Sequence, residues 1–411
     1  MKINLTPCRL LVRIGLATLL PSLIVVQHAR ADEFDTFNVT AGVSVVHDDN
    51  LFRLSSGANP NTVLGKSTKA DDIAVSTLGL KLSKPYSLQR FELEADVVDT
   101  RYRNFDYLNF TAINYAAAWR WSLTPYLHGN LSSDRKQGLN SFVDYTAYGI
   151  RNLRTDQNQR FDGVYEVSGS WRILGGVAQI TRTNDQPFTQ VGNTRLNNAE
   201  AGLRYDMRSG SSLSYITRSG RGEYFNQDQP VPFPSLFDNR FDQRENEVRL
   251  IWAITGKTTI DGRVAHLERT HAHFSQRDYS GNVGNLNVKW NITDKTSLTA
   301  ELARDLNSFQ SLSSSFISDD RFSLSPYWQI SAKTALRARY DYARRDYRGA
   351  IADTPFNNRV DTLQGAMIAL EWQALRTLFV RASLQNDRRT SNQSGFDFDS
   401  KMVGVSAQAT F

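Results

Sequence analysis

The sequence has a single cysteine, Cys8, which lies close to its start. Without others, neither disulfide bonds nor thiolate metal sites can stabilise the rest of the chain. After the first thirty residues no apolar run approaches the roughly 18 residues of a membrane-spanning helix, which excludes a helical membrane protein. The chain also lacks the charge excess of disordered proteins, and its aromatic content of 11% is too high for one.

Residues 1–31 have the pattern of a secretory signal peptide. A basic stretch precedes a mostly apolar segment over residues 14–26, and Ala29-Arg30-Ala31 fits the small-x-small cleavage pattern. We therefore expect export and cleavage, with residues 32–411 as the mature part. Cleavage would remove four of the 48 lysines and arginines and none of the 42 acidic residues. The net charge of the mature part is then about +2 instead of +6. This balance argues against a nucleic-acid partner.

Strict alternation of apolar and polar residues is the dominant pattern after residue 35. In residues 199–207, for example, Ala201, Leu203 and Tyr205 alternate with Arg204 and other polar residues. A period of two over ten or more residues indicates strands with one apolar face, long enough for a tilted membrane crossing of about 9–11 residues. We count eighteen such segments, with sixteen as the alternative. They lie near 36–47, 71–83, 90–103, 108–120, 125–136, 158–171, 176–185, 196–207, 211–223, 241–253, 258–270, 281–291, 296–308, 319–330, 334–347, 360–373, 377–389 and 400–411.

The connections between these segments tend to alternate in length. Tight turns, as at residues 208–210 and 293–295, alternate with longer polar loops, as at 48–70 and 224–240. Short turns at one end and long loops at the other are typical of outer-membrane proteins. The sequence therefore predicts an all-β fold, a transmembrane antiparallel up-and-down β-barrel of about 18 strands.

A tryptophan motif recurs every 38 residues, at Trp252, Trp290 and Trp328, each followed within a few residues by Lys-Thr. Trp372 begins a shortened copy, and Trp171 a looser one. Each copy is predicted to place tryptophan just before a short turn. Because tryptophan favours the membrane–water boundary, we interpret Trp252, Trp290, Trp328 and Trp372 as a periplasmic-side aromatic girdle. A propeller blade would need four short strands per repeat, whereas each unit holds two long ones.

The predicted inward face carries charges of both signs. These side chains either brace the inner wall or line a passage for a polar molecule, and the sequence leaves both interpretations open. The candidate lumen-lining residues are Arg204, Arg249, Arg263, Lys289, Arg337, Arg339, Arg381, Glu245 and Glu247.

Residues 229–238 form an unusual loop segment with three prolines, which favour an extended conformation. Phe233 and Phe237 are its apolar residues. They are candidates for a constriction inside the barrel or for stacking on sugar rings, and packing is the favoured interpretation.

Few residues indicate chemistry. The acidic groups Asp48-Asp49-Asn50 and Asp71-Asp72 lack the spacing of a calcium loop, so we interpret them as solvated loop ends. No motif joins the histidines to a nucleophile or a third metal ligand. We expect no catalytic residue, no cofactor and no bound metal, and we keep a barrel enzyme as the third hypothesis for function.

Several segments resemble a known family, the exopolysaccharide-biosynthesis outer-membrane barrels of the EpsL type. The similar segments are residues 37–54, which include Asp49-Asn50-Leu51-Phe52, residues 151–155, residues 160–162 and residues 171–176. The resemblance implies an outer-membrane component of an exopolysaccharide locus, often associated with an exosortase system. It implies no catalytic residues.

Our main hypothesis is therefore an outer-membrane barrel that takes part in exopolysaccharide biosynthesis or export, as a conduit for polymer. The alternative is a porin or specific channel for uptake of small solutes. The expected partners are the lipid bilayer, lipopolysaccharide, exopolysaccharide, periplasmic export components and the outer-membrane assembly machinery. The alternating C-terminal segment that ends in Phe411 resembles the signal that this machinery reads.

The asymmetry of the connections predicts an orientation. The short turns should face the periplasm and the loop at 224–240 the cell surface. A membrane-impermeant thiol reagent applied to intact cells should therefore label Asp228→Cys strongly and Ser331→Cys weakly. The reverse pattern would show that the orientation is wrong.

Overall fold

The computed structural model describes residues 36–143, 150–186, 192–225, 239–272, 274–309 and 311–411. Within these residues it contains no helix long and apolar enough to span a bilayer. The helical elements are the short helix α1 (Pro60–Leu64) and the 3-10 turns η1 (Asp106–Leu108) and η4 (Ser275–Arg277). The strands are β1 (Phe37–Asp48), β2 (Asp71–Tyr86), β3 (Gln89–Tyr102), β4 (Phe110–Thr124), β5 (Leu127–Leu139), β6 (Leu153–Glu166), β7 (Trp171–Asn184), β8 (Thr194–Asp206), β9 (Ser212–Tyr224), β10 (Arg240–Thr255), β11 (Thr258–His271), β12 (Tyr279–Asn291), β13 (Thr296–Ser308), β14 (Phe316–Gln329), β15 (Thr334–Arg348), β16 (Val360–Gln373), β17 (Leu378–Ser391) and β18 (Phe398–Thr410).

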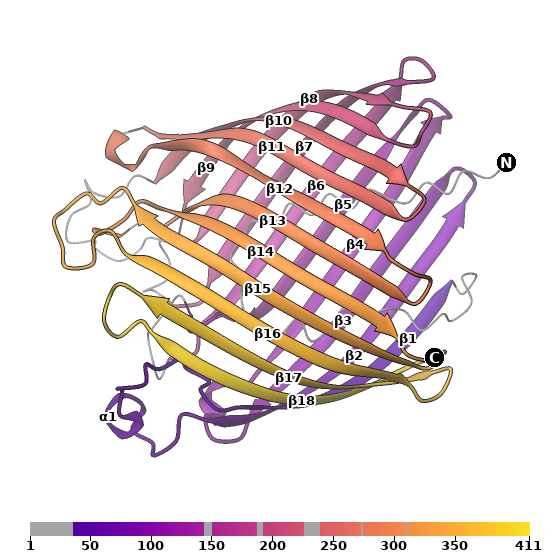
Figure 1. Ribbon diagram of the computed structural model, residues 1–411. Coiled ribbons are helices and arrows are strands. Elements are labelled where there is room, and N and C mark those ends of the chain that lie inside the picture. The colour runs from indigo at the N-terminus through magenta and orange to yellow at the C-terminus, as the bar shows by residue number, and fades with distance from the viewer. Residues whose placement is uncertain (1–35, 144–149, 187–191, 226–238, 273, 310) are drawn as a thin grey trace.

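The strands form one closed antiparallel barrel (Figure 1). Each strand pairs with its neighbours in the chain, and β1 also pairs with β18, from Thr40 opposite Thr410 to Asp48 opposite Met402. Closure leaves no unpaired strand edge, which the interior of a bilayer would not tolerate. The predicted up-and-down barrel with eighteen strands is confirmed.

The two ends of the barrel differ in their connections. Short turns, such as 87–88, 125–126 and 256–257, lie at the end that also holds the C-terminus, here called the turn end. Long connections, such as 49–70 and 349–359, lie at the opposite end, here called the loop end (Figure 1). The alternation of connection lengths predicted from the sequence is present.

The period of two sorts side chains between the outer and inner faces. On β8, Leu203 and Tyr205 are exposed on the outside, whereas Glu200 and Arg204, at even-numbered positions, are partly buried and form ion pairs. The four repeat tryptophans, Trp252, Trp290, Trp328 and Trp372, lie beside short turns and are 45–50% exposed. Side chains of this kind, apolar in body and polar at one end, suit the boundary of a bilayer.

The outer face changes character along each strand. On β10, Val248 is exposed and apolar, while Asn246, Arg244 and Asp242 follow it towards the loop end. β17 repeats this order with Leu384 followed by Asn386 and Arg388. An apolar band near the turn end is therefore followed by a polar collar, which is the sequence of environments from acyl chains to head groups.

The predicted bounds of one hairpin, β6 and β7, are wrong, because the turn between the two strands lies several residues earlier in the chain than predicted. The sequence analysis placed strands at 158–171 and 176–185, whereas β6 ends at Glu166 and β7 begins at Trp171. The residues between them are Ser168-Gly169-Ser170, which favour turns, and the N–H of Val167 donates to the carbonyl of Trp171 at 3.0 Å. Trp171 therefore follows a turn instead of preceding one.

The alternation makes a stability prediction for two adjacent residues. Leu203→Arg places a charge in the apolar band and should lower the free energy of unfolding by about 2–4 kcal/mol. Arg204→Ala removes only a part-exposed pair with Asp206, worth about 0–1 kcal/mol. Urea titration of the barrel folded in lipid vesicles measures both. Equal losses would show that the two side chains do not lie on opposite faces.

Candidate functional site: the barrel interior

The inner face of β6 to β11 carries a network of ion pairs. Its centre is Arg218 on β9, whose guanidinium donates to Glu200 at 2.8 Å, Glu245 at 2.7 Å and Glu247 at 2.6 Å. Arg263 on β11 reaches the same two β10 carboxylates, Glu245 at 2.9 Å and Glu247 at 3.2 Å. On the other side Arg160 of β6 pairs with Glu200. We call these six residues the arginine–carboxylate network.

The side chains of this network come from five strands, β6 and β8 to β11, and its contacts pass across β7, which contributes none of the six residues. Glu247 is almost fully buried and Glu200 and Arg218 are largely so. A buried charge is costly unless it is paired, and here each carboxylate faces at least two guanidinium groups. These contacts fit the first interpretation from the sequence, in which the charges brace the inner wall, whereas a passage for a polar molecule stays a prediction.

A second group of cations lies near the turn end on the opposite part of the wall. Arg337 on β15 donates to Glu371 at 2.9 Å, and Arg339 pairs with Asp341 at 2.7 Å. Arg381 on β17 stands opposite Glu371 in the register, and its guanidinium lies 3.5 Å from the sulfur of Met367. In the part of the chain described, this group holds more arginines than carboxylates at contact distance.

The remaining candidates are distributed along the wall. Arg204 donates to Asp206, and Arg249 to Asp261 at 2.6 Å. Lys289 is exposed near the turn end and forms no ion pair with any described residue. Phe233 and Phe237 lie outside the described residues, so their role as a constriction stays a prediction.

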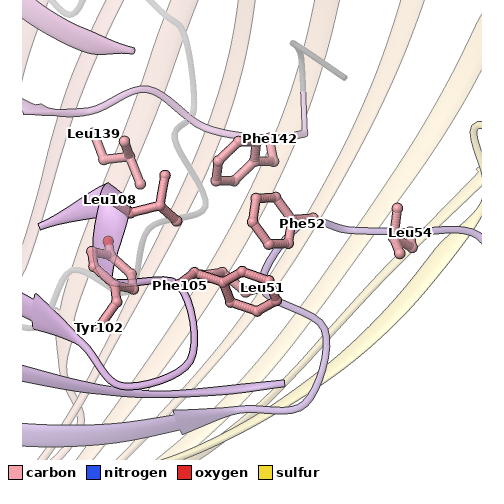
Figure 2. Close-up of a cluster of buried hydrophobic side chains, with 8 residues drawn as sticks. All are labelled: Leu51, Phe52, Leu54, Tyr102, Phe105, Leu108, Leu139 and Phe142. Carbon is pink, nitrogen blue, oxygen red and sulfur yellow. The ribbon is translucent and has the colours of Figure 1, made fainter. Parts of the chain in front are cut away.

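An apolar cluster fills part of the loop end, and the sequence analysis did not find it. Figure 2 shows it: Phe52 lies between Phe105 and Phe142, with ring centroids 4.7 and 4.6 Å away. The residues come from the ends of β3 and β5 and from three connections that are far apart in the sequence. We call this set the mouth cluster: Leu51, Phe52, Leu54, Tyr102, Phe105, Leu108, Leu139 and Phe142.

Two buried carboxylates hold the mouth cluster in place. Asp71 is fully buried and accepts backbone N–H groups from Asp72, Arg103, Asn104 and Phe105 at 2.8–3.1 Å. A carboxylate that accepts this many N–H groups fixes the path of the connection between β3 and β4. Phe105 is thereby directed into the cluster.

Asp48 fixes the connection between β1 and β2 in the same way. Its carboxylate accepts hydrogen bonds from the Arg53 guanidinium at 2.7 and 2.9 Å and from the Ser400 hydroxyl at 2.8 Å. The Asn50 side chain donates to the carbonyls of Leu54 and Asp399. The prediction that these acidic groups are solvated loop ends is wrong for Asp48 and Asp71, because paired donors compensate their burial.

One segment of this end reaches the far side of the barrel. Val143, four residues after the end of β5, is buried against Leu363 on β16 and Phe398 on β18. Arg389 on β17 donates to the carbonyl of Val143. Along the wall β4, β3, β2, β1 and β18 separate β5 from β17, so residues 139–143 cross part of the mouth.

A cationic contact joins two other connections at the loop end. Arg277 in η4 is buried and donates to the carbonyls of Ser311 at 2.8 Å and Ser314 at 3.1 Å. Burial lowers the pKa of the Arg277 guanidinium to about 10, so it remains charged at neutral pH. The connection after β11 is thereby attached to the one after β13.

Comparisons with known proteins agree with this architecture. The sequence model of the family described as "Putative beta-barrel porin 2" matches residues 254–411, which is less than half of the chain. The comparison with curated proteins gives no match.

The fold is similar to that of solved outer-membrane proteins. Pseudomonas aeruginosa OccK2 (OpdF) aligns with a TM-score of 0.50 at 11% identity, over 92% of this chain and 98% of that chain. The outer membrane protein OpdK of Pseudomonas aeruginosa aligns with a TM-score of 0.48 at 10% identity, over 91% of this chain and 99% of that chain. A BenF-like porin from Pseudomonas fluorescens Pf-5 aligns with a TM-score of 0.49 at 9% identity, over 92% of this chain and 98% of that chain. The chain therefore has a closed β-barrel fold similar to that of solved outer-membrane proteins.

The contact between Arg389 and Val143 makes a prediction about the mouth. Arg389→Met keeps the bulk of the side chain but removes its donors, which should lower the local opening free energy by about 1.5–3 kcal/mol. Hydrogen exchange at residues 139–143 should accelerate, and single-channel conductance should rise. Arg388→Met, on the outer face of the same strand, is the matched control. Unchanged exchange and conductance in a folded Arg389→Met barrel would contradict this role.

Proposed function

We propose that the protein is an outer-membrane channel through which small polar solutes enter the cell. The observation that carries this proposal is the combination of a charged inner wall with a mouth narrowed by packed apolar side chains. A long polymer would have to displace the mouth cluster, in which removal of a single buried aromatic side chain costs about 3–5 kcal/mol. We infer that a small solute passes beside the cluster without displacing it.

We infer further that the channel favours anions. Arg337, Arg339 and Arg381 lie close together near the turn end, and Lys289 adds a solvated cation. Between them, only Glu371 and Asp341 make ion pairs with these arginines among the described residues. Fixed cations raise the local concentration of mobile anions. Glu245 and Glu247, by contrast, are neutralised within the arginine–carboxylate network.

Export of exopolysaccharide is the second candidate. It is supported by the resemblance of residues 37–54, 151–155, 160–162 and 171–176 to EpsL-type barrels, which implies a conduit for polymer. The first of these segments contains Asp48, Asn50 and Arg53, which hold the mouth cluster. Opening of this cluster would then be part of polymer passage.

The remaining expectations about processing belong to the same proposal. Residues 1–31 would be removed as a signal peptide on export, and residues 32–411 would form the barrel. Phe411 would be read by the outer-membrane assembly machinery, and its exposure of 72% at the turn end is compatible with that. Lipopolysaccharide would surround the polar collar, and periplasmic export components would be needed only for polymer passage.

Charge reversal tests the selectivity. In planar bilayers the wild-type channel should prefer chloride to potassium, and the triple variant R337E/R339E/R381E should lower that preference severalfold. The effect should shrink in about 1 M salt, where the Debye length is about 3 Å. The triple variant to Gln checks whether charge, and not loss of Arg337–Glu371 bracing, is responsible. Unchanged ion preference in a folded triple Glu variant would refute the anion channel.

A deletion strain separates the two candidate functions. Slower uptake of small solutes with normal polysaccharide secretion supports the channel. Polysaccharide retained in the cell, with normal growth on small sugars, would instead support export. Secreted and cell-retained polymer are measured alongside growth in the same cultures.

A further inference from the structure

The outer wall between β5 and β10 contains a hollow of about 750 Å³. The part of this hollow over β5, β6 and β7 is apolar, with the side chains of Leu131, Phe161 and Val177 each about half exposed. The small side chains of Ala199 and Ser219, on the next two strands, leave space beside these larger ones. We call this hollow the outer groove.

The part of the outer groove nearest the loop end is polar. Gln179 donates to the side-chain oxygen of Asn197 at 2.7 Å, which leaves the other amide atoms of this pair for a ligand. The exposed side chain of Arg221 lies in the same cross-strand row as Asn197, and that of Arg244, opposite Ser219 on the next strand, lies two residues nearer the turn end. The groove therefore spans the boundary between the apolar band and the polar collar.

The guanidinium groups of Arg221 and Arg244 are accessible to a ligand. Arg221 lies 3.5 Å from Asp242, and its side chain is still 92% exposed. Arg244 makes no ion pair with a described residue, since Glu268 opposite it lies 3.5 Å from His266. Among the described residues, the two exposed carboxylates at this rim, Asp242 and Glu268, make only long contacts of 3.5 Å, with Arg221 and His266, so both guanidinium groups can still form the bidentate contacts that a phosphate favours.

We propose that the outer groove binds a phosphorylated glycolipid of the outer leaflet, lipopolysaccharide. One acyl chain lies along Phe161 and Val177, sugar hydroxyls meet the amides of Gln179 and Asn197, and a phosphate lies between Arg221 and Arg244. The proposal rests on the outer-membrane location of the barrel, but not on what passes through its lumen. A second copy of the chain is the competing occupant, and the oligomeric state of the groove variants distinguishes it.

The test uses the full barrel folded in detergent and purified lipopolysaccharide as the probe. Native mass spectrometry should show one glycolipid retained by the wild type, and R221E/R244E should weaken its binding at least tenfold. Dephosphorylated lipopolysaccharide should bind the wild type as weakly as the intact glycolipid binds the double variant. Arg388→Glu, an exposed arginine on the outer face of β17, is the matched control and should bind normally.

A second variant tests the shape of the site independently of charge. Ala199→Phe fills the outer groove and should also weaken binding, while gel mobility before and after heating confirms that each variant folds. Equal binding by wild type, R221E/R244E and Ala199→Phe would overturn the proposal, as would an equal loss in Arg388→Glu. A dimer or trimer that dissociates only in these groove variants would assign the surface to a second copy instead. Normal channel conductance in R221E/R244E keeps this result separate from the proposed transport function.

Discussion

The structure depends on one constraint: inside a bilayer every backbone N–H and C=O must find a partner within the protein. A sheet satisfies this only when it closes, and β1 meets β18 over nine residue pairs to do so. The closing strands are joined at the rim by reciprocal backbone hydrogen bonds between Val39 and Phe411, at 2.9 and 2.8 Å. Closure then separates an outer face for lipid from an enclosed inner face, and the period of two assigns each side chain to one of them.

Closure of the barrel also creates a second constraint, because charged side chains that are buried on the inner face need partners of opposite charge or hydrogen-bond donors. The inner face is polar because it is not in contact with lipid, but it is also partly dry, so its charges occur in pairs. Arg218 with its three carboxylates is the extreme case, and the carboxylates of Asp48 and Asp71 at the loop end follow the same rule with guanidinium and backbone N–H donors. The polar wall and the apolar mouth cluster are thus held by the same kind of contact, a buried carboxylate with several donors.

The sequence predicted the barrel well because alternation and tryptophan spacing are local signals. Leu203 and Arg204 were assigned to opposite faces from their neighbours alone. The β6–β7 turn was misplaced because Val167 and Gly169 continue the period of two through a segment whose serines and glycine form a turn. The mouth cluster was missed for a different reason. Phe52, Phe105 and Phe142 belong to three different connections, and nothing in the spacing of one connection shows that the three will meet.

The contacts of Val143 also constrain the order in which the protein can assemble. Its segment follows β5, in the first half of the chain, but its partners Leu363, Arg389 and Phe398 belong to the last three strands. Residues 139–143 can therefore take their place across the mouth only after the last strands have joined the sheet. The final strands thus complete both the wall and this crossing segment, whereas the mouth cluster contains residues from 51–142 alone.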